Sequence, residues 1–406
     1  MVPGLYLDPR DHFPGGLKVS SPRSKNINKE TLYARSTVVW FFLKIIALSK
    51  ETILIDLTII FKNTPIIITG IPLRIDHETL RNMVREIFVK AGFRSEDASI
   101  IADHLVAANL RGVDSHGVVR VRYYLDTIEK GFIKPCGDLS ILRDSGVFIK
   151  ADGNSCLGIP VAYKATMLVI ERAREYGVGV LGCGNLGHVG MLAYYTSMIA
   201  REGFIGFAAT NANPMVVPWG GAKPVFGTNP FSISFPTRSE PIVIDMATSA
   251  IAHFKAIVAS RKGEILPEGV AIDEKGEITR DPNSLYALLP FGGYKGYAIS
   301  LAVEILAGIL GGGILSVEVP AGSMRQGGFI VAALDPSRLI DREEYLSKIE
   351  MLIKTIKNTQ PAKGYSEVLI PGEPEERKYR ERVREGIELD EETWREISQF
   401  YARAHT

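Results

Sequence analysis

Apolar side chains recur at intervals of three and four residues from residue 76 onward, which is the spacing of one helix face. The first such stretch follows Asp76, a residue type that caps helices, and ends before Gly92. A second stretch begins at Ser95 and ends before Gly112. The pattern therefore predicts two consecutive amphipathic helices joined by a short turn.

A third helix is predicted from about residue 115 to residue 130, and it carries two different faces. Its apolar positions fall on one stripe of the helix. His116, Arg120 and Tyr124 are spaced four residues apart and fall on a separate stripe. One face is suited to packing and the other to chemistry.

The middle third of the chain contains short apolar or alternating runs bounded by glycine, proline or asparagine, which is typical of strands. Helices of small and apolar residues are predicted between these runs. After Pro290 the helical spacing returns, and a further strand and two charged helices follow. The predicted strands are 147–151, 178–181, 204–210, 231–235, 242–245 and 329–334, and the predicted helices are about 160–175, 188–201, 299–310, 342–358 and 390–403.

The first seventy residues follow a different pattern. Residues 1–36 are rich in Pro, Gly, Ser and Lys without periodicity. The apolar runs at 38–48 and 53–61 are shorter than the roughly 20 residues of a membrane span, and no signal-peptide pattern is present. Three interpretations stay open: a dispensable or poorly ordered extension, which we favour, an added packed hairpin, or a membrane or partner contact. We expect no membrane association.

Composition narrows the possible partners. The chain has 47 Lys+Arg and 46 Asp+Glu, a formal charge of +1, so whole-chain electrostatics do not indicate nucleic-acid binding. The three cysteines, an odd number without CxxC spacing, indicate a reducing compartment and no structural zinc. We therefore predict a cytoplasmic protein. The 39 glycines are an excess, and they gather in three loops.

The first glycine-rich loop, residues 181–190, matches GxGxxG between a predicted strand and a predicted helix. The acidic residue that a Rossmann fold places about 20 residues further on is missing, so the dinucleotide interpretation is weak. His188 is predicted at the entrance of the helix, where the positive helix end would lower its pKa and favour the neutral base. The alternative is a structural histidine with satisfied hydrogen bonds.

The other two loops also have the composition of anion-binding backbone. Residues 210–230 are dense in Asn, Gly and Pro, whose exposed N–H groups suit phosphate or carboxylate, although they also fit a plain connection. Residues 291–297 place Lys295 between glycines just before a helix, which suits a phosphate. This loop does not match a P-loop.

The polar stripe of the third helix fits the oxidation of a 2-hydroxy acid. That reaction needs a cation for the carboxylate, a base for the hydroxyl proton and an adjacent hydride acceptor. Arg120 and the histidines supply the first two. No GxSxG motif or papain-type cysteine indicates nucleophilic catalysis, and the seven histidines show no ligand spacing such as HExxH.

Seven motifs, in order over residues 73–400, resemble the type-2 malate/L-lactate dehydrogenase family. That family also includes sulfolactate, ureidoglycolate and diketogulonate dehydrogenases and some cyclic imino-acid reductases. The motifs are DSHGVVR at 114–120, GNLGH at 184–188, TNANP at 210–214 with PWGG at 218–221, GTNP at 227–230, IDMATS at 244–249, GGYKGY at 292–297 and PGEP at 371–374.

The resemblance implies an α+β, non-Rossmann fold and a homodimer. It implies a helical domain at 73–145, completed by 297–406, and an α+β, largely antiparallel cofactor-binding domain at 146–296. Residues 1–72 have no counterpart and form an atypical N-terminal extension, and the segment 311–326 is several residues shorter than in the family.

The resemblance also assigns roles to residues. His188 is the expected acid/base, and His116 shares the catalytic centre, so which of the two transfers the proton stays open. Ser115, Arg120 and Tyr124 are expected to bind the substrate. No metal is expected. The expected cofactor-binding residues are Ala212, Met246, Ala247, Thr248, Lys295, Gly372 and Glu373.

The predicted function is hydride transfer between NAD or NADP and a small 2-hydroxy or 2-oxo acid, with malate or lactate first among the substrates. The alternatives are a cyclic imino-acid (C=N) reductase and a sulfolactate or ureidoglycolate dehydrogenase of the same family. A non-catalytic nucleotide-binding protein is a further alternative, against which the presence of both His116 and His188 argues. The sequence leaves open the substrate and the choice between NAD and NADP.

Overall fold

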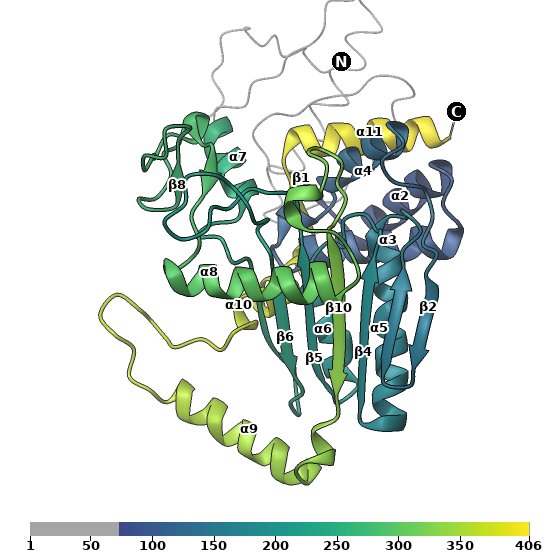
Figure 1. Ribbon diagram of the computed structural model, residues 1–406, viewed down its shortest axis with the longest axis vertical. Coiled ribbons are helices and arrows are strands. Elements are labelled where there is room, and N and C mark those ends of the chain that lie inside the picture. Colours follow the sequence, from purple (N-terminus) through teal and green to yellow (C-terminus); the bar gives the residue numbers. More distant parts are fainter. Residues whose placement is uncertain (1–72, 406) are drawn as a thin grey trace, which may run out of the picture. The chain divides into compact units, whose positions relative to one another are not determined.

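The computed structural model describes residues 73–405 (Figure 1), so the predictions for the first seventy residues lie outside the described range. The large sheet and all of the described helices belong to one compact unit, residues 76–387 and 391–405. Of a second unit only residues 73–75 and 388–390 are described. The strands β1 (Leu73–Ile75) and β11 (Ile387–Leu389) pair with each other. None of the described helices is both long and apolar enough to cross a membrane.

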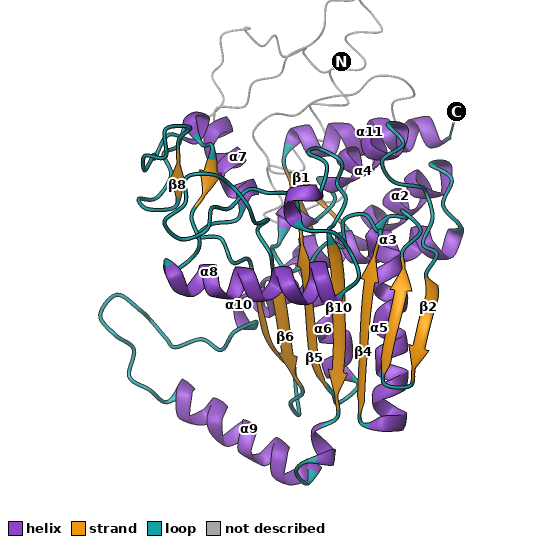
Figure 2. Ribbon diagram, in the orientation of Figure 1, coloured by secondary structure: helices purple, strands orange, loops and turns teal. Residues whose placement is uncertain are grey.

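A seven-stranded mixed sheet is the centre of the larger unit (Figure 2). Five of its six neighbouring strand pairs are antiparallel, and only β3 and β4 run parallel. The six predicted strands are all present. The additional strand, β2, was missed because all six of its residues are exposed and give no apolar pattern. In sheet order the strands are β2 (Ser140–Ser145), β3 (Phe148–Asp152), β4 (Val178–Gly184), β10 (Gly328–Leu334), β5 (Ile205–Asn211), β6 (Phe231–Phe235) and β7 (Ile242–Met246).

Helices cover both faces of this sheet, which explains the continuous apolar run of its central strand, β10. Phe329 and Val331 pack into the core beneath α5 (Gly158–Tyr176) and α6 (Leu192–Arg201). Ile330 points to the other face, where α8 (Tyr294–Val303) continues into the π-helix η3 (Glu304–Leu310). Both faces of β10 are therefore covered by packed helices.

The predicted helices on either side of the sheet segment are also confirmed. Asp76 caps α2 (His77–Lys90), its carboxylate accepting from Thr79 N at 2.8 Å. The two charged helices are α9 (Arg342–Lys357) and α11 (Glu391–Ala404). Two helices were not predicted, and α10 shows why, since none of its residues is buried and no apolar stripe marks it. The remaining helices are α3 (Ser95–Leu110), α4 (Arg120–Glu129), α7 (His253–Lys262) and α10 (Glu373–Glu385), the last two being those not predicted.

The cysteines differ from the sequence interpretation. Cys136 and Cys156 form a disulfide, and only Cys183 is free. The spacing of 20 residues carries no recognisable signal, and the bond arises because the segment after α4 runs beside the loop that follows β3. Disulfides also occur in intracellular proteins of hyperthermophiles, so the bond does not locate the protein. The cytoplasmic location stays a prediction.

Candidate active site

The DSHG motif forms a tight turn rather than the start of a long helix. Ser115 and His116 lie in the 3-10 turn η1 (Asp114–His116), and α4 begins at Arg120. Gly117 between them is extended, and the Asn109 side chain occupies the space that a Cβ at Gly117 would need. The predicted helix was therefore wrong over its first turn, because the sequence did not show this close contact with Asn109.

His188 reaches the polar face of α4 from the loop between β4 and α6. Its Nδ1 lies 2.7 Å from the Tyr124 hydroxyl, and its ring stacks on that of His116 with centroids 5.6 Å apart. Because α6 begins only at Leu192, His188 is not at a helix entrance as predicted. The pKa of His188 is instead lowered well below 6.5 by burial and by the charges of Arg120 and His116. Its imidazole is neutral at neutral pH.

His116 has a similar environment. Its Nδ1 lies 3.0 Å from the Ser115 hydroxyl. Burial, with a contribution from the charge of Arg120, lowers the pKa of His116 to about 3. Both histidines are therefore neutral, and in each of them a hydroxyl group contacts Nδ1. Nδ1 of His188 also accepts from Gly190 N at 3.2 Å. In neither ring does Nε2 bond to a residue in the described part of the chain, and the distances do not decide which ring transfers the proton.

Arg120 is a cation without an anionic partner in the described part of the chain. Its Nε donates to the Ser115 carbonyl at 2.6 Å, but no described carboxylate lies within ion-pair distance of its guanidinium. The rings of Tyr123 and Phe254 lie 5.8 and 5.5 Å from its Cζ. Aromatic rings stabilise a guanidinium without neutralising it. The group is thus available for a ligand carboxylate.

Two features near these residues were missed by sequence reasoning. His253 and Phe254 lie at the start of α7, and burial together with the Arg120 charge lowers the pKa of His253. The fully buried His104 accepts from Met191 N at 2.9 Å and so supports the loop after His188. Neither histidine lies in a glycine-rich loop or recognisable spacing, so no local signal could have found them.

The three segments expected to bind the cofactor meet through backbone hydrogen bonds. Thr248 follows β7, and its N–H and hydroxyl donate to the Thr228 carbonyl at 2.9 and 3.0 Å. The Thr248 carbonyl accepts from Phe291 N at 3.0 Å, at the start of the loop that carries Lys295. Gly227 packs against the backbone of Ala212 so closely that a Cβ would overlap it. Met246 and Ala247 lead into this junction from β7.

Gly372 and Glu373 join this region from the start of α10. The carbonyl of the preceding Pro371 accepts from Val243 N on β7 at 3.1 Å. The Glu373 carboxylate, however, is already bound by Lys357 at 2.9 Å. It also bonds to Arg377 and to the Ile370 N–H. Its charge is therefore engaged, which leaves the backbone as the part that can contact a cofactor.

The start of α8 fits a cofactor phosphate. Lys295 lies in the first turn of this helix, is exposed, and has no ion-pair partner among the described carboxylates. The N-cap Gly293 contributes no side-chain hydrogen bond, so the first N–H groups of α8 are free of a side-chain cap. A cation beside uncapped helix N–H groups suits a phosphate.

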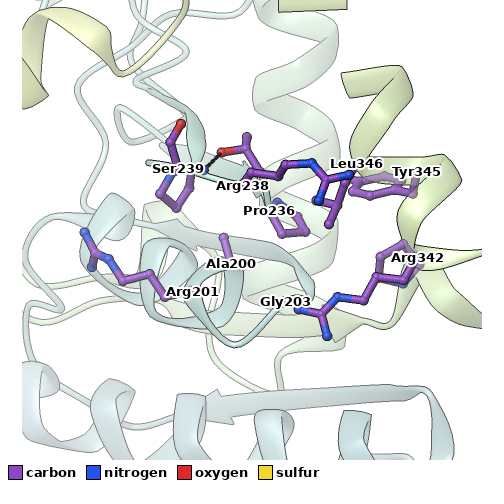
Figure 3. Close-up of a pocket in the computed structure, with 12 residues that line it drawn as sticks. Ala200, Arg201, Gly203, Pro236, Arg238, Ser239, Arg342, Tyr345 and Leu346 are labelled. Atoms are coloured by element: carbon purple, nitrogen blue, oxygen red, sulfur yellow. Dashed lines mark hydrogen bonds between the residues drawn. The ribbon is translucent and has the colours of Figure 1, made fainter. Parts of the chain in front are cut away.

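A cavity of about 270 Å³ lies elsewhere, between the end of α6, the β6–β7 turn and the start of α9 (Figure 3). None of the predicted site residues lines it. One of the arginines that line it, Arg238, is paired with Glu343 at 2.8 Å and Glu350 at 3.1 Å.

Comparison with known proteins identifies the family of the chain. The family model described as malate/L-lactate dehydrogenase matches residues 75–398. The malate/(S)-sulfolactate dehydrogenase of Methanothermus fervidus is 39% identical over 322 residues, 78% of this chain and 94% of that protein. Among solved structures, the sulfolactate dehydrogenase of Methanocaldococcus jannaschii has a TM-score of 0.77 at 35% identity, covering 82% of this chain and 98% of that one. The delta1-piperideine-2-carboxylate reductase of Pseudomonas syringae pv. tomato has a TM-score of 0.74 at 29% identity, covering 81% and 99%.

The chain belongs to the malate/L-lactate dehydrogenase family. It is a hydroxyacid dehydrogenase, an oxidoreductase that acts on a CH–OH group, and dehydrogenases of this family use nicotinamide cofactors.

Proposed function

We propose that this protein interconverts a small 2-hydroxy acid and its 2-oxo acid, with malate or lactate as the first candidates. The observation that supports this is the unpaired guanidinium of Arg120 beside two neutral histidines. A bidentate cation and a neutral base are the two groups that such a substrate needs from the protein.

In the oxidation direction, Arg120 binds the substrate carboxylate and His188 takes the hydroxyl proton at Nε2. That role needs the tautomer in which Nδ1–H donates to the Tyr124 hydroxyl oxygen, 2.7 Å away, in place of the bond that Nδ1 accepts from Gly190 N at 3.2 Å in this structure. The Ser115 hydroxyl contacts Nδ1 of His116 at 3.0 Å. We place the His116 ring on the other side of the bound acid. A bound nicotinamide ring supplies the hydride acceptor. Burial of Tyr124 raises its pKa and keeps its hydroxyl protonated.

We propose that the cofactor, NAD or NADP, is held by the junction of the glycine-rich loops. Lys295 would bind a phosphate, and Ala212, Met246–Thr248 and the Gly372–Glu373 backbone would contact the rest. The GNLGH motif then serves to present His188 rather than to bind a pyrophosphate, and the site is not of the Rossmann type. In this scheme residues 146–296 form the cofactor domain, and 73–145 with 297–406 form the helical domain.

The test is oxidation of NADH and of NADPH by the purified protein, with oxaloacetate, pyruvate, sulfopyruvate and a cyclic imino acid as acceptors. We expect turnover with a 2-oxo acid, and the panel also distinguishes NAD from NADP. Turnover with the cyclic imine alone would favour the alternative reductase function, to which one structural neighbour points by name. No turnover with any acceptor, by protein that is folded, would contradict the proposal.

We further propose a cytoplasmic two-fold dimer. Large apolar side chains are exposed on η3 and α9, including Ile309 at 61%, Leu310 at 65% and Met351 at 64%. Exposed apolar surface of this kind is typical of subunit interfaces. Sedimentation of a monomer at micromolar concentration would contradict the dimer.

A further inference from the structure

Glu304, the first residue of η3, is a buried carboxylate with no cation beside it. It is 6% exposed, and no Lys, Arg or His in the described part of the chain lies within ion-pair distance. A buried charge without a counter-ion is costly unless hydrogen bonds satisfy it. The residues that donate hydrogen bonds to this carboxylate therefore indicate its role.

Four donors, two on each oxygen, satisfy the carboxylate. Oε1 accepts from Asn211 Nδ2 at 3.1 Å and from Ser316 N at 2.6 Å. Oε2 accepts from Asn229 Nδ2 at 2.8 Å and from the Ser316 hydroxyl at 2.7 Å. Asn211, Asn229 and Ser316 are themselves fully buried.

These donors belong to the loops that are expected to hold the cofactor. Asn211 immediately precedes Ala212, and its Oδ1 accepts from Gly328 N on β10 at 2.7 Å. Asn229 follows Thr228, whose carbonyl bonds to Thr248. The Ser316 hydroxyl also accepts from Gly227 N at 3.2 Å. One carboxylate thus connects both ends of the 211–230 loop and the segment after η3.

The backbone around Glu304 leaves little freedom for another arrangement. Asn229 has a φ of +34°, a backbone angle that a residue other than glycine keeps only when its surroundings hold it there. A Cβ at Gly327 would overlap the Asn211 side chain. Because neither loop can shift without breaking these contacts, the carboxylate sets where Ala212 and Thr248 lie.

We propose that Glu304 is a positioning residue for the cofactor site, acting through Asn211 and Asn229 rather than by touching cofactor or substrate. This rests on the proposed function of these loops. In Glu304→Gln, an amide replaces one oxygen. Whichever of the two oxygens the amide nitrogen replaces, it lies opposite an asparagine Nδ2–H, of Asn211 or of Asn229. A buried N–H donor then loses its acceptor.

The experiment measures the dissociation constant of NADH and NADPH by fluorescence titration, together with the acid KM at saturating cofactor. For Glu304→Gln we expect the dissociation constant of the preferred cofactor to rise about ten-fold, and the acid KM to change less than about two-fold. Glu318→Gln is the matched control, because among the described residues that exposed carboxylate accepts only from Leu315 N, at 2.7 Å. We expect no change in it.

A second variant covers the case in which Glu304→Gln fails to fold. Ser316→Ala removes one donor and the bond to Gly227, and should raise the same constant to a smaller degree. A lowered melting temperature with unchanged cofactor affinity would show a merely structural role and overturn the inference. Wild-type protein that binds neither nucleotide would overturn the proposed function itself, which is a separate outcome.

Discussion

At the scale of single residues, the site consists of two neutral imidazoles and one unneutralised guanidinium. Low pKa values keep His116 and His188 free of protons, so that either ring can accept one. Charging either ring would place a second cation beside Arg120 in a buried setting. In the proposed reaction, either neutral ring can accept the hydroxyl proton of a substrate that brings the negative charge of its own carboxylate.

His188→Ala should lower kcat by roughly 10²–10⁴-fold with little change in cofactor affinity, the usual scale for a lost acid/base. In the wild type, the lowered pKa of His188 should place the acid limb of kcat/KM well below pH 6.5, because only the neutral ring accepts the proton. Steady-state kinetics across pH measure both. Near-normal turnover of His188→Ala, with His116→Ala inactive, would reverse the two roles.

Arg120→Lys should act mainly on the KM of the acid. A lysine keeps the charge but replaces the planar fork by a point charge, and it loses the contacts with the rings of Tyr123 and Phe254. We expect a rise in KM of about ten-fold or more, with a smaller effect on kcat. An unchanged KM would show that the carboxylate binds elsewhere.

At the scale of elements, a side chain of α10 holds the η1 turn in place by hydrogen bonds. Arg382 donates to both Asp114 oxygens at 2.7 and 3.1 Å and also to the Asn109 carbonyl. Asn109 in turn donates to Asp114 at 2.6 Å and accepts from Val118 N at 2.8 Å. The conformation of the DSHG turn therefore depends on a helix more than 250 residues further along the chain.

Arg382→Leu should therefore loosen the turn, lowering the free energy of unfolding by about 1 kcal/mol and raising the acid KM. Arg380→Leu on the same helix is the control. That side chain is 70% exposed and, within residues 73–405, pairs only with Glu376, so its loss should cost less than about 0.5 kcal/mol. Denaturant unfolding and kinetics on both variants test this; equal effects would contradict the role of Arg382.

The elements also show what periodicity can predict. The buried strands of the sheet and the amphipathic α2 were predictable because each buries a regular set of apolar positions. The exposed β2 and α10 bury no such set and left no pattern. The start of the third helix was wrong for another reason, since Gly117 is extended to fit the Asn109 side chain, a contact that no local pattern reveals.

At the scale of the whole molecule, the sequence motifs identified the loops of the candidate site but not the contacts that join those loops. The motifs pointed to His116, Arg120 and His188, which the fold brings together. They did not point to His253, Phe254 or Glu304, which reach the site or its supports only through tertiary packing. Residues whose role depends on distant partners carry no signal in a single sequence.

The Cys136–Cys156 bond should stabilise the folded chain by about 2–4 kcal/mol, because it closes a loop and so reduces the conformational entropy of the unfolded chain. It also lies next to the site, since the Cys156 carbonyl accepts from Gly187 N at 2.8 Å. Denaturant unfolding with and without reductant measures the effect. The double variant Cys136→Ala/Cys156→Ala should have the same stability with and without reductant, close to that of the reduced wild type, and a wild type insensitive to reduction would contradict this prediction.

The turn η1 and the start of α4 place Ser115, His116, Arg120 and Tyr124 within one short run of chain, whereas Phe254 approaches Arg120 on α7. His188 meets this run from the loop after β4, so the groups proposed to act on the acid come from separate segments of the chain. Because Phe254 contacts Arg120 itself, we expect a change at Phe254 to alter how the carboxylate is held, and not only which acid fits.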